Sequence, residues 1–455
     1  MKLPERGRIH FIGIGGAGMS AIAKVLIERG HEVSGSDMRE SRATAALSDM
    51  GAHVTIGHDP AVVEGAAAVV YSSAVKEDNP ELVGARQAGV AVLHRGEALA
   101  SVLFRSHSIV VAGTHGKTTT SSMVLSILRG AGFDPTYVIG GALEGVPINA
   151  GSGGDDVAVA ESDESDGSFL LLDPTIAVIT NIEPDHLDQW GSIEAIEEAF
   201  QGFIGTAECA VVRNDDKVAR LAAERNGLRL VTYGAGGEIS AGEVFLKAHS
   251  TAFALVVGES RVAVHLGTPG HHNLLNALAA AAACFSLGVG IEAIGAGLES
   301  FSGVERRYQL RGDKRNITVI DDYAHHPTEI AAALGAARLG PWRRVIAVFQ
   351  PHLFSRTLAL RAEFGGAFGD ADVVVVTDVY AAREEPVPGV TGKIISDAVC
   401  ISLFGRTVAY VPERRELLAY LAARARPGDL VLTLGAGDIA TLADELLEAL
   451  DVEAA

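Results

Sequence analysis

The 455-residue chain contains little cysteine and no long hydrophobic run. Its cysteines, Cys209, Cys284 and Cys400, are scattered and odd in number, which argues against a disulfide framework and for a reducing compartment. No apolar run reaches the roughly 18 residues of a membrane span. Glycines at 13–18 interrupt the apolar N-terminal stretch, so it does not fit a signal peptide. We therefore expect a cytoplasmic protein with no membrane partner.

Basic residues are also in deficit, with 37 Lys and Arg against 57 Asp and Glu and a net charge of −20. This balance argues against nucleic acid or an anionic membrane as the main partner. It does not exclude small anionic ligands, because a few local donors can override the global field. The composition gives no indication of oligomeric state.

Aromatic residues are scarce at 5%, whereas glycine is abundant at 52 residues. This combination favours an α/β enzyme with glycine turns over an all-β or fibrous protein. The length suggests about three domains at roughly 150 residues each. We expect an N-terminal Rossmann-like domain at 1–104, a central P-loop ATPase-like domain at 105–302, and a C-terminal Rossmann-like α/β domain at 303–455.

Short apolar strands alternate with helical segments, which predicts parallel sheets covered by helices. The expected strands are 8–12, 32–35, 67–71, 90–93, 108–112, 157–160, 176–180, 210–213, 318–320, 345–349, 373–377 and 430–434. The expected helices are 17–28, 118–129, 273–285, 327–339, 358–368 and 413–424. Between 238 and 266, short alternating runs split by Gly and Ser predict antiparallel hairpins, so the central sheet should be mixed.

The first motif is Gly13-Ile14-Gly15-Gly16-Ala17-Gly18, between a strand and a helix, with Asp37 following 19 residues after Gly18. Its glycines allow a tight turn and close approach to a diphosphate, for which the helix N-terminus supplies donors. Taken alone, the motif predicts NAD. It cannot distinguish a dinucleotide from a UDP-sugar, and a tight turn without a ligand is the alternative.

The second motif is Gly113-Thr114-His115-Gly116-Lys117-Thr118-Thr119-Thr120, also between a strand and a helix. It is a shortened P-loop, because Val111 stands where the strict pattern has its first glycine. Backbone N–H groups would cradle phosphates, Lys117 would reach the β and γ oxygens, and the Thr118 hydroxyl would ligate Mg²⁺. The sequence therefore predicts ATP binding; the alternative is a glycine turn with an incidental lysine.

Two phosphate-binding turns in successive domains disfavour a simple dehydrogenase, which needs no grip on a γ-phosphate. A chain that holds a nucleoside triphosphate and a second diphosphate compound is better suited to activating that compound. A dehydrogenase with an extra nucleotide module, and a regulatory nucleotide-binding protein without chemistry, remain the alternatives from other classes.

Acidic segments follow two of the predicted strands of the second domain. Glu161-Ser162-Asp163-Glu164-Ser165-Asp166, hereafter the acidic loop, follows one, and the segment 181–188, which contains His186, follows the next. Ligands gather at this edge of a parallel sheet, and oxygen donors suit Mg²⁺. We expect Lys117, Thr118, Glu161 and His186 on one rim, with plain solvated loops as the alternative.

These motifs together resemble the Mur ligases, the ATP-dependent amide-bond ligases of peptidoglycan precursor synthesis. GTHGKTTT, ESDESD, NIEPDHLD, HHNLLNA and DDYAHHPTEI occur in family order along essentially the whole chain. HFIGIGGAGMSAIA and GVERRYQL most resemble the alanine-adding branch, which implies UDP-N-acetylmuramate and L-alanine as substrates. A recycling ligase that attaches a preformed peptide to the same sugar is the alternative within the family.

The resemblance implies roles for matched residues, with ATP and Mg²⁺ as cofactors. ATP would be held by Gly113, Thr114, His115, Gly116, Lys117, Thr118, Thr119, Asn273 and Asn276, and magnesium by Thr118, Glu161 and His186. The UDP moiety would contact Gly15, Gly16, Ala17, Gly18, Asp37, Ser72 and Ser73. The substrate cleft would be lined by Arg306, Arg307, Tyr323, His325, His326, His352 and Arg356. Lys117, His186 and Arg356 are the candidate catalytic residues.

The chain departs from the ligases that add later amino acids, which carry a carbamylated lysine after the D-H-x-D segment. No lysine occurs between Trp190 and Val212, and Phe200 occupies that place by count. This departure fits the alanine-adding branch. On local grounds, His325 or His326 could simply cap a helix, and Arg306 with Arg307 could be a surface pair. The Pro/Gly-rich loop at 378–390 is a candidate for closing over the amino acid.

Overall fold

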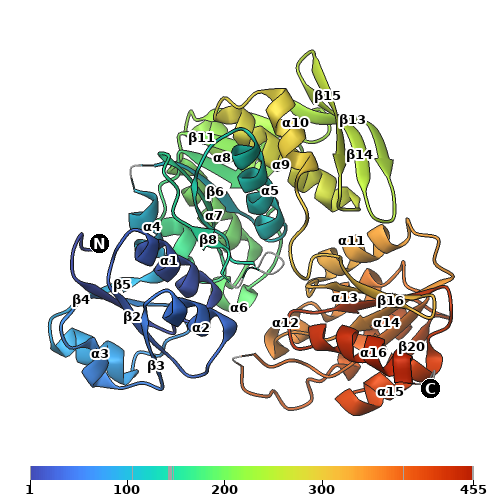
Figure 1. The fold of residues 1–455 in the computed structure, drawn as a ribbon. Coiled ribbons are helices and arrows are strands. Elements are labelled where there is room, and N and C mark those ends of the chain that lie inside the picture. The colour runs from blue at the N-terminus through green and yellow to red at the C-terminus, as the bar shows by residue number, and fades with distance from the viewer. Residues whose placement is uncertain (1, 105, 142–145, 147, 383, 453–455) are drawn as a thin grey trace. The chain divides into compact units, whose positions relative to one another are not determined.

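The computed structural model describes residues 2–104, 106–141, 146, 148–382 and 384–452. The chain has a three-domain α/β fold built on three sheets (Figure 1). By packing it forms two compact units. The first comprises residues 1–243, 253–264 and 275–304, and the second 244–252, 265–274 and 305–455.

The first sheet is fully parallel, with strand order β3-β2-β1-β4-β5. Its strands are β1 (Arg8–Ile12), β2 (Val33–Asp37), β3 (His53–Ile56), β4 (Ala66–Tyr71) and β5 (Ala91–His94). Its helices are α1 (Ala17–Glu28), α2 (Arg42–Asp49), η1 (Pro60–Val63), α3 (Pro80–Gln87) and α4 (Arg95–Leu103). Ile9 and Phe11 pack toward α1, α2 and α4, whereas Ile12 packs toward η1 and α3, so helices cover both faces. The strand order reverses between β1 and β4, where open α/β sheets bind ligands at the carboxyl ends of their strands.

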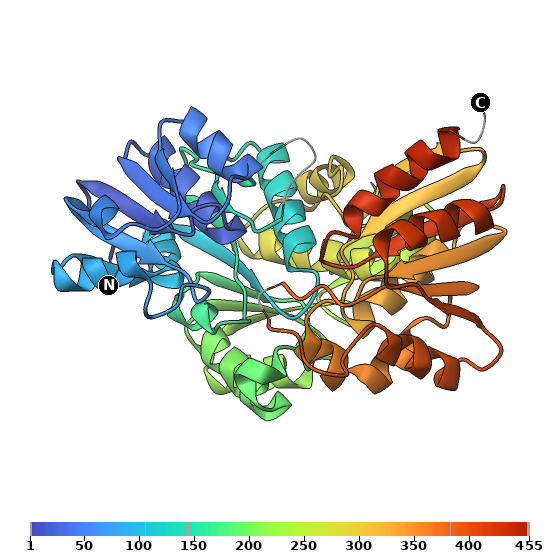
Figure 2. The same ribbon diagram turned by 90° about the horizontal axis from the view of Figure 1, so that it is seen from below.

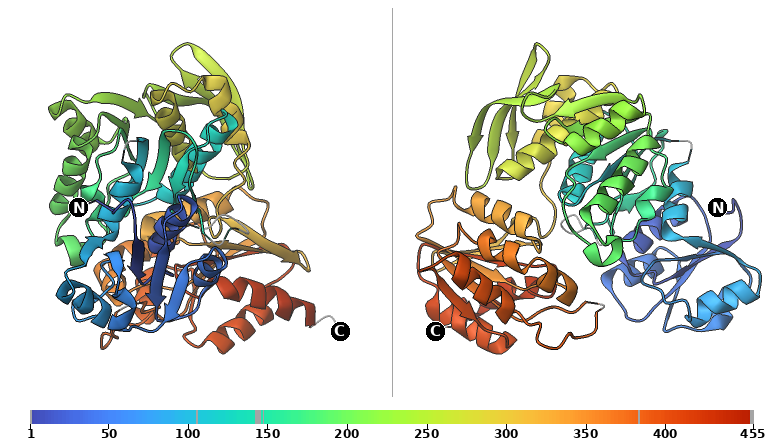
Figure 3. Two further views of the ribbon diagram at one scale, coloured as in Figure 1. Left: turned by 60° about the vertical axis from the view of Figure 1, so that its left-hand side comes forward. Right: turned by 180° about the vertical axis from the view of Figure 1, so that it is seen from behind.

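The second sheet has ten strands, in the order β15-β14-β13-β12-β11-β10-β6-β9-β7-β8. Its strands are β6 (His107–Ala112), β7 (Thr136–Val138), β8 (Ala150–Gly151), β9 (Val157–Glu161), β10 (Ile176–Ile179), β11 (Cys209–Arg213), β12 (Arg229–Tyr233), β13 (Ile239–Leu246), β14 (Thr251–Val257) and β15 (Ser260–Leu266). Its helices are α5 (Lys117–Gly130), η2 (Ser168–Leu171), α6 (Leu187–Trp190), α7 (Ile193–Gly205), α8 (Lys217–Arg225), α9 (His271–Ser286) and α10 (Ile291–Glu299). Helices α5, α9 and α10 lie on the face seen in Figure 1, and α7 and α8 on the face seen from behind in Figure 3.

The core of this sheet is parallel, and β7 with β8 forms an antiparallel pair. Strands β13, β14 and β15 are sheet neighbours joined by connections of four and two residues. Connections this short join antiparallel strands, because a parallel crossover needs a dozen residues or so. The mixed central sheet with hairpins at 238–266 agrees with the sequence.

The third sheet has the order β16-β17-β21-β18-β19-β20 and is parallel except for β16. Its strands are β16 (Gln309–Lys314), β17 (Ile317–Asp322), β18 (Arg344–Phe349), β19 (Val373–Val376), β20 (Thr407–Tyr410) and β21 (Asp429–Leu434). Its helices are α11 (Pro327–Ala337), α12 (Phe354–Ala359), α13 (Arg361–Ala367), α14 (Lys393–Ser402), α15 (Arg414–Arg424) and α16 (Ala440–Val452). The sheet lies between α15 and α16 on one face and α11, α13 and α14 on the other (Figure 2).

One predicted helix is wrong in detail. The segment 358–368 is not a single helix, because α12 ends at Ala359 and α13 begins at Arg361, with Leu360 between them outside helical geometry. The three cysteines are free; Cys209 and Cys284 are buried and Cys400, on α14, is exposed. Within the described part of the chain, no helix is long and apolar enough to cross a membrane.

Candidate active site

The glycine turn after β1 has the backbone geometry that the motif requires. Gly13 has φ +79°, which strongly favours glycine, and Gly16 caps α1 without a side-chain hydrogen bond. The carboxylate of Asp37, at the end of β2, accepts the Gly15 N–H at 2.9 Å, and a Cβ on Gly15 would lie 2.9 Å from it. Asp37 therefore stabilises the turn, and no side chain caps the first backbone N–H groups of α1, which can bind an anion.

Other predicted residues gather at the same sheet edge. Ser72 and Ser73 follow β4, beside the turn that follows β1, because β1 and β4 are neighbours. His94 ends β5 and Arg95 begins α4 next to them. The Ser73 hydroxyl contacts His94 Nε2 at 2.9 Å. The residues predicted to contact a diphosphate therefore lie together at the switch point of the sheet.

The P-loop connects β6 to α5, and residues after β10 brace it. The Thr114 N–H donates to the Asn181 carbonyl at 3.1 Å, and the His115 N–H donates to the Asn181 side chain at 2.9 Å. Gly116 has φ +79°, and a Cβ there would lie 2.4 Å from Oδ1 of Asn276 on α9. Asn276 is thus placed against the loop, and Asn273 lies three residues earlier on the same helix.

Lys117, the first residue of α5, is held by three acceptors. Its Nζ donates to the carbonyls of Gly113 at 2.6 Å and Thr114 at 3.2 Å, and to Oε2 of Glu164 at 2.7 Å. Burial by itself would lower the pKa of Lys117, but the carboxylates of Glu164 and Asp163 raise it well above its usual value. Burial raises the pKa of Glu164 to about 7 against the opposing effect of Lys117. The ammonium is charged and points into the acidic loop.

The neighbouring residue Thr118 faces the first carboxylate of the loop. Its hydroxyl donates to Oε1 of Glu161 at 2.9 Å, while Oε2 accepts the Gly140 N–H at 2.9 Å. A hydroxyl and a carboxylate in contact are hard oxygen donors of the kind that Mg²⁺ takes. These two residues fit a magnesium ion bound beside the P-loop.

His186 has a left-handed backbone with φ +50°. Its ring nitrogen and the carboxylates of Asp163 and Glu164 lie within 4.8 Å of one another, and Glu161 is outside this group. The Trp190 indole N–H donates to the Glu164 carbonyl at 3.2 Å and ties the loop to α6. Phe200 is fully buried against Phe169, with ring centroids 5.1 Å apart. A core aromatic residue therefore occupies the position that, by count, corresponds to the carbamylated lysine of the ligases that add later amino acids.

In the second unit, rings and guanidinium groups of the predicted residues are in contact. The Tyr323 ring lies 5.0 Å from the Arg306 guanidinium carbon and 5.1 Å from that of Arg307. His325 lies edge-on to Tyr323 at 5.3 Å and to His352 at 5.7 Å. Arg356 is buried, and its Nη1 lies 3.4 Å from Nδ1 of His352. These side chains form one cluster at the carboxyl ends of β17 and β18.

Some of these residues also have structural roles. His326 caps α11, since its Nδ1 accepts the Thr328 N–H at 3.3 Å. Arg306 is anchored by Asp321 at 3.1 Å and by the Gly435 carbonyl at 2.6 Å. Burial raises the pKa of Asp322 to about 6, with Arg307 opposing the shift. His326 thus has the helix-capping role that its position before Pro327 allows.

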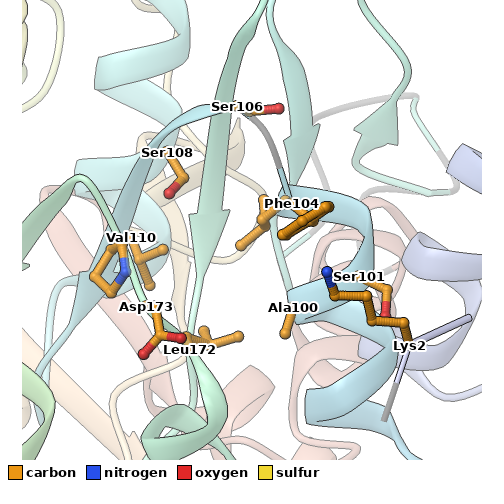
Figure 4. Close-up of a pocket in the computed structure, with 11 residues that line it drawn as sticks. Lys2, Ala100, Ser101, Phe104, Ser106, Ser108, Val110, Leu172 and Asp173 are labelled. Atoms are coloured by element: carbon orange, nitrogen blue, oxygen red, sulfur yellow. The ribbon is translucent and has the colours of Figure 1, made fainter. Parts of the chain in front are cut away.

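A cavity of about 610 Å³ lies elsewhere in the first unit (Figure 4). It is lined by the end of α4, the start of β6 and Asp173, with Lys2 and Phe104 beside it. This is the amino end of β6, opposite the end that carries the P-loop, and none of the predicted site residues lines it.

Sequence reasoning named the acidic loop and the loop at 378–390 without singling out Glu164 or Tyr380 within them, and it missed Arg95. Glu164 pairs with Lys117, Arg95 pairs with Asp166 of the acidic loop, and the Tyr380 ring stacks on His352 at 5.8 Å. The signal for Arg95 was its position directly after a strand at the ligand-binding edge. For Tyr380, the signal was its position in the loop that follows β19.

The family descriptions match most of the chain. The Mur ligase family, catalytic domain, matches residues 8–107; the Mur ligase middle domain matches 111–284; and the Mur ligase, glutamate ligase domain, matches 306–437. The chain is 47% identical to a UDP-N-acetylmuramate–L-alanine ligase of Renibacterium salmoninarum, covering 99% of this chain and 97% of that protein. It is 45% identical to the enzyme of the same name from Desulforamulus reducens, covering 98% of each.

Solved structures agree with these matches. The UDP-N-acetylmuramate–alanine ligase MurC of Thermotoga maritima superposes with a TM-score of 0.81 at 31% identity, covering 98% of this chain and 100% of that one. A murein peptide ligase of Psychrobacter arcticus gives a TM-score of 0.71 at 25% identity, with 98% of each chain covered. The full-length matches and the shared site motifs establish that this chain belongs to the Mur ligase family.

Proposed function

We propose that the protein is an ATP-dependent ligase that joins L-alanine to the lactyl carboxylate of UDP-N-acetylmuramate. The observation that carries this proposal is the pairing of two phosphate-binding turns in one unit, at Gly13–Gly18 and Gly113–Lys117. The relatives with 45–47% identity bear the name of this ligase. The N-terminal domain would bind the UDP-sugar, the central domain ATP, and the C-terminal domain the amino acid.

The first step makes the carboxylate reactive. A carboxylate and an amine do not condense unaided at neutral pH, because a carboxylate oxygen is a poor leaving group. A lactyl oxygen attacks the γ-phosphorus of ATP, and the bond from this phosphorus to the β,γ-bridging oxygen breaks. ADP is the leaving group, and the sugar-borne carboxylate becomes an acyl phosphate. Two anions must meet in this step, so the buried ammonium of Lys117 stabilises the charge on the transferred phosphoryl oxygens.

The second step forms the amide bond. The amine of L-alanine attacks the acyl carbon, a tetrahedral intermediate forms, and phosphate leaves while the nitrogen loses its proton. Arg356, with its planar fork of donors, would hold the alanine carboxylate. Arg306, Arg307, Tyr323, His325, His326 and His352 would line the substrate site.

Magnesium fits the oxygen donors beside the P-loop. Thr118 and Glu161 would hold it, and His186 lies within 4.8 Å of the carboxylates of Asp163 and Glu164, the second of which pairs with Lys117. When bound, the ion neutralises charge on the ATP oxygens. Asn276, placed against Gly116, and Asn273 on the same helix would contact the nucleoside. Chelation with EDTA should stop ADP formation, and added Mg²⁺ should restore it.

The proposal is tested by ADP release with UDP-N-acetylmuramate and a panel of acceptors: L-alanine, L-serine, glycine and a tripeptide. ADP should form fastest with L-alanine and only when the UDP-sugar is present. A preference for the tripeptide would instead indicate a peptide-recycling ligase. Steady ATP hydrolysis that is indifferent to both substrates would refute ligase activity.

A further inference from the structure

The acidic loop carries carboxylates to two different cationic side chains. Glu164 pairs with Lys117 of the P-loop at 2.7 Å. Two residues later, Oδ2 of Asp166 accepts Nε and Nη2 of Arg95 at 3.0 and 2.8 Å. Asp163 lies 3.6 Å from Arg95 Nη2. One short segment after β9 therefore contacts both the P-loop and the start of α4.

Arg95 lies beside the glycine turn that follows β1. A Cβ on Gly18, the second residue of α1, would lie 3.1 Å from Arg95 Nη1, so the missing side chain lets the guanidinium approach the helix start. Nε and Nη2 are taken by Asp166, whereas Nη1 has no hydrogen-bond partner among the described residues. The group is therefore anchored on one side and has a donor to spare on the side of the glycine turn.

A chain of hydrogen bonds from the serine after β4 fixes Asp166. Burial lowers the pKa of His94, so the ring is neutral; its Nδ1 accepts the Gly96 N–H, which leaves the proton on Nε2. Nε2 then donates to Ser73 Oγ at 2.9 Å, and Ser73 donates to Asp166 at 2.7 Å. Asp166 also accepts the Ser168 N–H at 3.0 Å. The pKa of Asp166, which burial alone would raise, is lowered to about 2 by Arg95 and these donors.

We infer that Arg95 binds the diphosphate of the UDP-linked substrate and that Asp166 is the positioning residue that aims it. The inference rests on the proposed function, which places a diphosphate at the glycine turn. An arginine beside open helix N–H groups offers a fixed, charge-assisted donor to phosphate oxygens. Because Asp166 and Glu164 belong to one loop, the segment that orients Arg95 also holds Lys117, so the two phosphate sites share a support.

The test measures binding of UDP and UMP to the full chain by calorimetry, with ADP binding as a check on the central domain. These two probes differ by the β-phosphate, so their affinity ratio reports on diphosphate contacts and not on the uridine site. Arg95→Ala should lower UDP affinity roughly 10- to 100-fold while lowering UMP affinity less. Arg95→Lys should recover part of this loss, because it keeps the charge and loses the fork.

Asp166→Asn should lower the UDP-to-UMP preference by a smaller factor, roughly 3- to 10-fold, because the guanidinium remains but is no longer held in place. Ser73→Ala, which removes one donor to Asp166 and leaves Arg95 intact, should change the preference in the same direction. Glu77→Gln is the matched control, since it breaks an exposed ion pair with Arg86 in the same domain and should change nothing.

An unchanged UDP-to-UMP ratio in both Arg95→Ala and Asp166→Asn would overturn the inference. So would tighter UDP binding by Asp166→Asn, because the carboxylate would then repel the ligand instead of aiming the arginine. If the unmodified protein bound ADP but not UDP, the proposed function would fail and the inference with it. If every variant kept the UDP affinity and the UDP-to-UMP ratio of the unmodified protein, the proposed function would stand and only the inference would be refuted.

Discussion

The ion pair between Lys117 and Glu164 should dominate the local stability of the nucleotide-free P-loop. The side chains are 14% and 5% exposed, and their N–O distance is 2.7 Å. At this distance the attraction is about 6 kcal/mol with an effective dielectric constant of about 20, against which both groups lose hydration. Glu164→Gln removes the hydrogen-bonded counter-charge of this ammonium and leaves only the weaker attraction of Asp163 and Glu161; losing one partner of a buried pair typically costs about 3–5 kcal/mol. Two carbonyl acceptors remain, so we expect about 3 kcal/mol.

Hydrogen–deuterium exchange of peptides from α5 measures the local stability of this helix and does not require the whole chain to unfold in one step. Without nucleotide, Glu164→Gln should reduce protection in α5 about 100-fold, the equivalent of about 3 kcal/mol. The double variant Glu164→Gln/Lys117→Met should regain most of it, because no unpaired charge is then buried.

The control is Asp215→Asn, which removes an exposed partner of Arg213 and should leave α5 protection unchanged. If Glu164→Gln protected α5 as well as the unmodified protein does, the buried pair would contribute no more than a surface pair. The account of how Lys117 is held would then be wrong.

Three further predictions concern single positions. Lys117→Ala should lower the rate of ADP release by about 10³-fold or more by removing charge stabilisation, and near-normal turnover would contradict its assignment. The folded-state pKa of Asp322, about 6, exceeds the unfolded value near 3.8, so the contribution of Asp322 to stability falls as pH rises between these values. Between pH 5 and 7, the free energy of unfolding measured with denaturant should fall by about 1 kcal/mol more in the unmodified protein than in Asp322→Asn. Equal falls in the two proteins would refute this. Gly116→Ala should weaken ADP binding in calorimetry, because its Cβ would meet Asn276 at 2.4 Å, whereas Gly132→Ala, which has a similar φ of +89° in open space, should not; equal binding by both variants would rule out the clash.

Elements with strong apolar patterns could be predicted from the sequence. Strand 8–12 and helix 17–28 have the expected bounds, because glycines mark the turn between them. Strand β3 was missed because its four residues are only partly buried, and β16 because the polar run Gly312-Asp313-Lys314 hides an edge strand. Helix 358–368 breaks at Leu360 without a proline or glycine at that residue to signal it.

The sequence predicted where the residues of the candidate site lie, but not which side chains pair with one another. Strand ends placed the P-loop and the acidic loop at one edge, and Thr118 does meet Glu161. Which carboxylate faces which cation depends on the loop's internal turns, such as Asp163 accepting the Ser165 N–H, and on the left-handed Gly167. The pairing of Arg95 with Asp166 depends on sheet order and on two domains packing together, and neither is encoded in local spacing.

The distribution of thiols has a practical consequence. Burial raises the pKa of the Cys209 and Cys284 thiols, so both stay protonated and poorly nucleophilic. Cys400 alone of the three is open to solvent, and it belongs to the second unit. A maleimide dye should therefore attach at this one native position, and a second cysteine engineered into the first unit would turn the chain into a fluorescence ruler for movement between its halves as substrates are added.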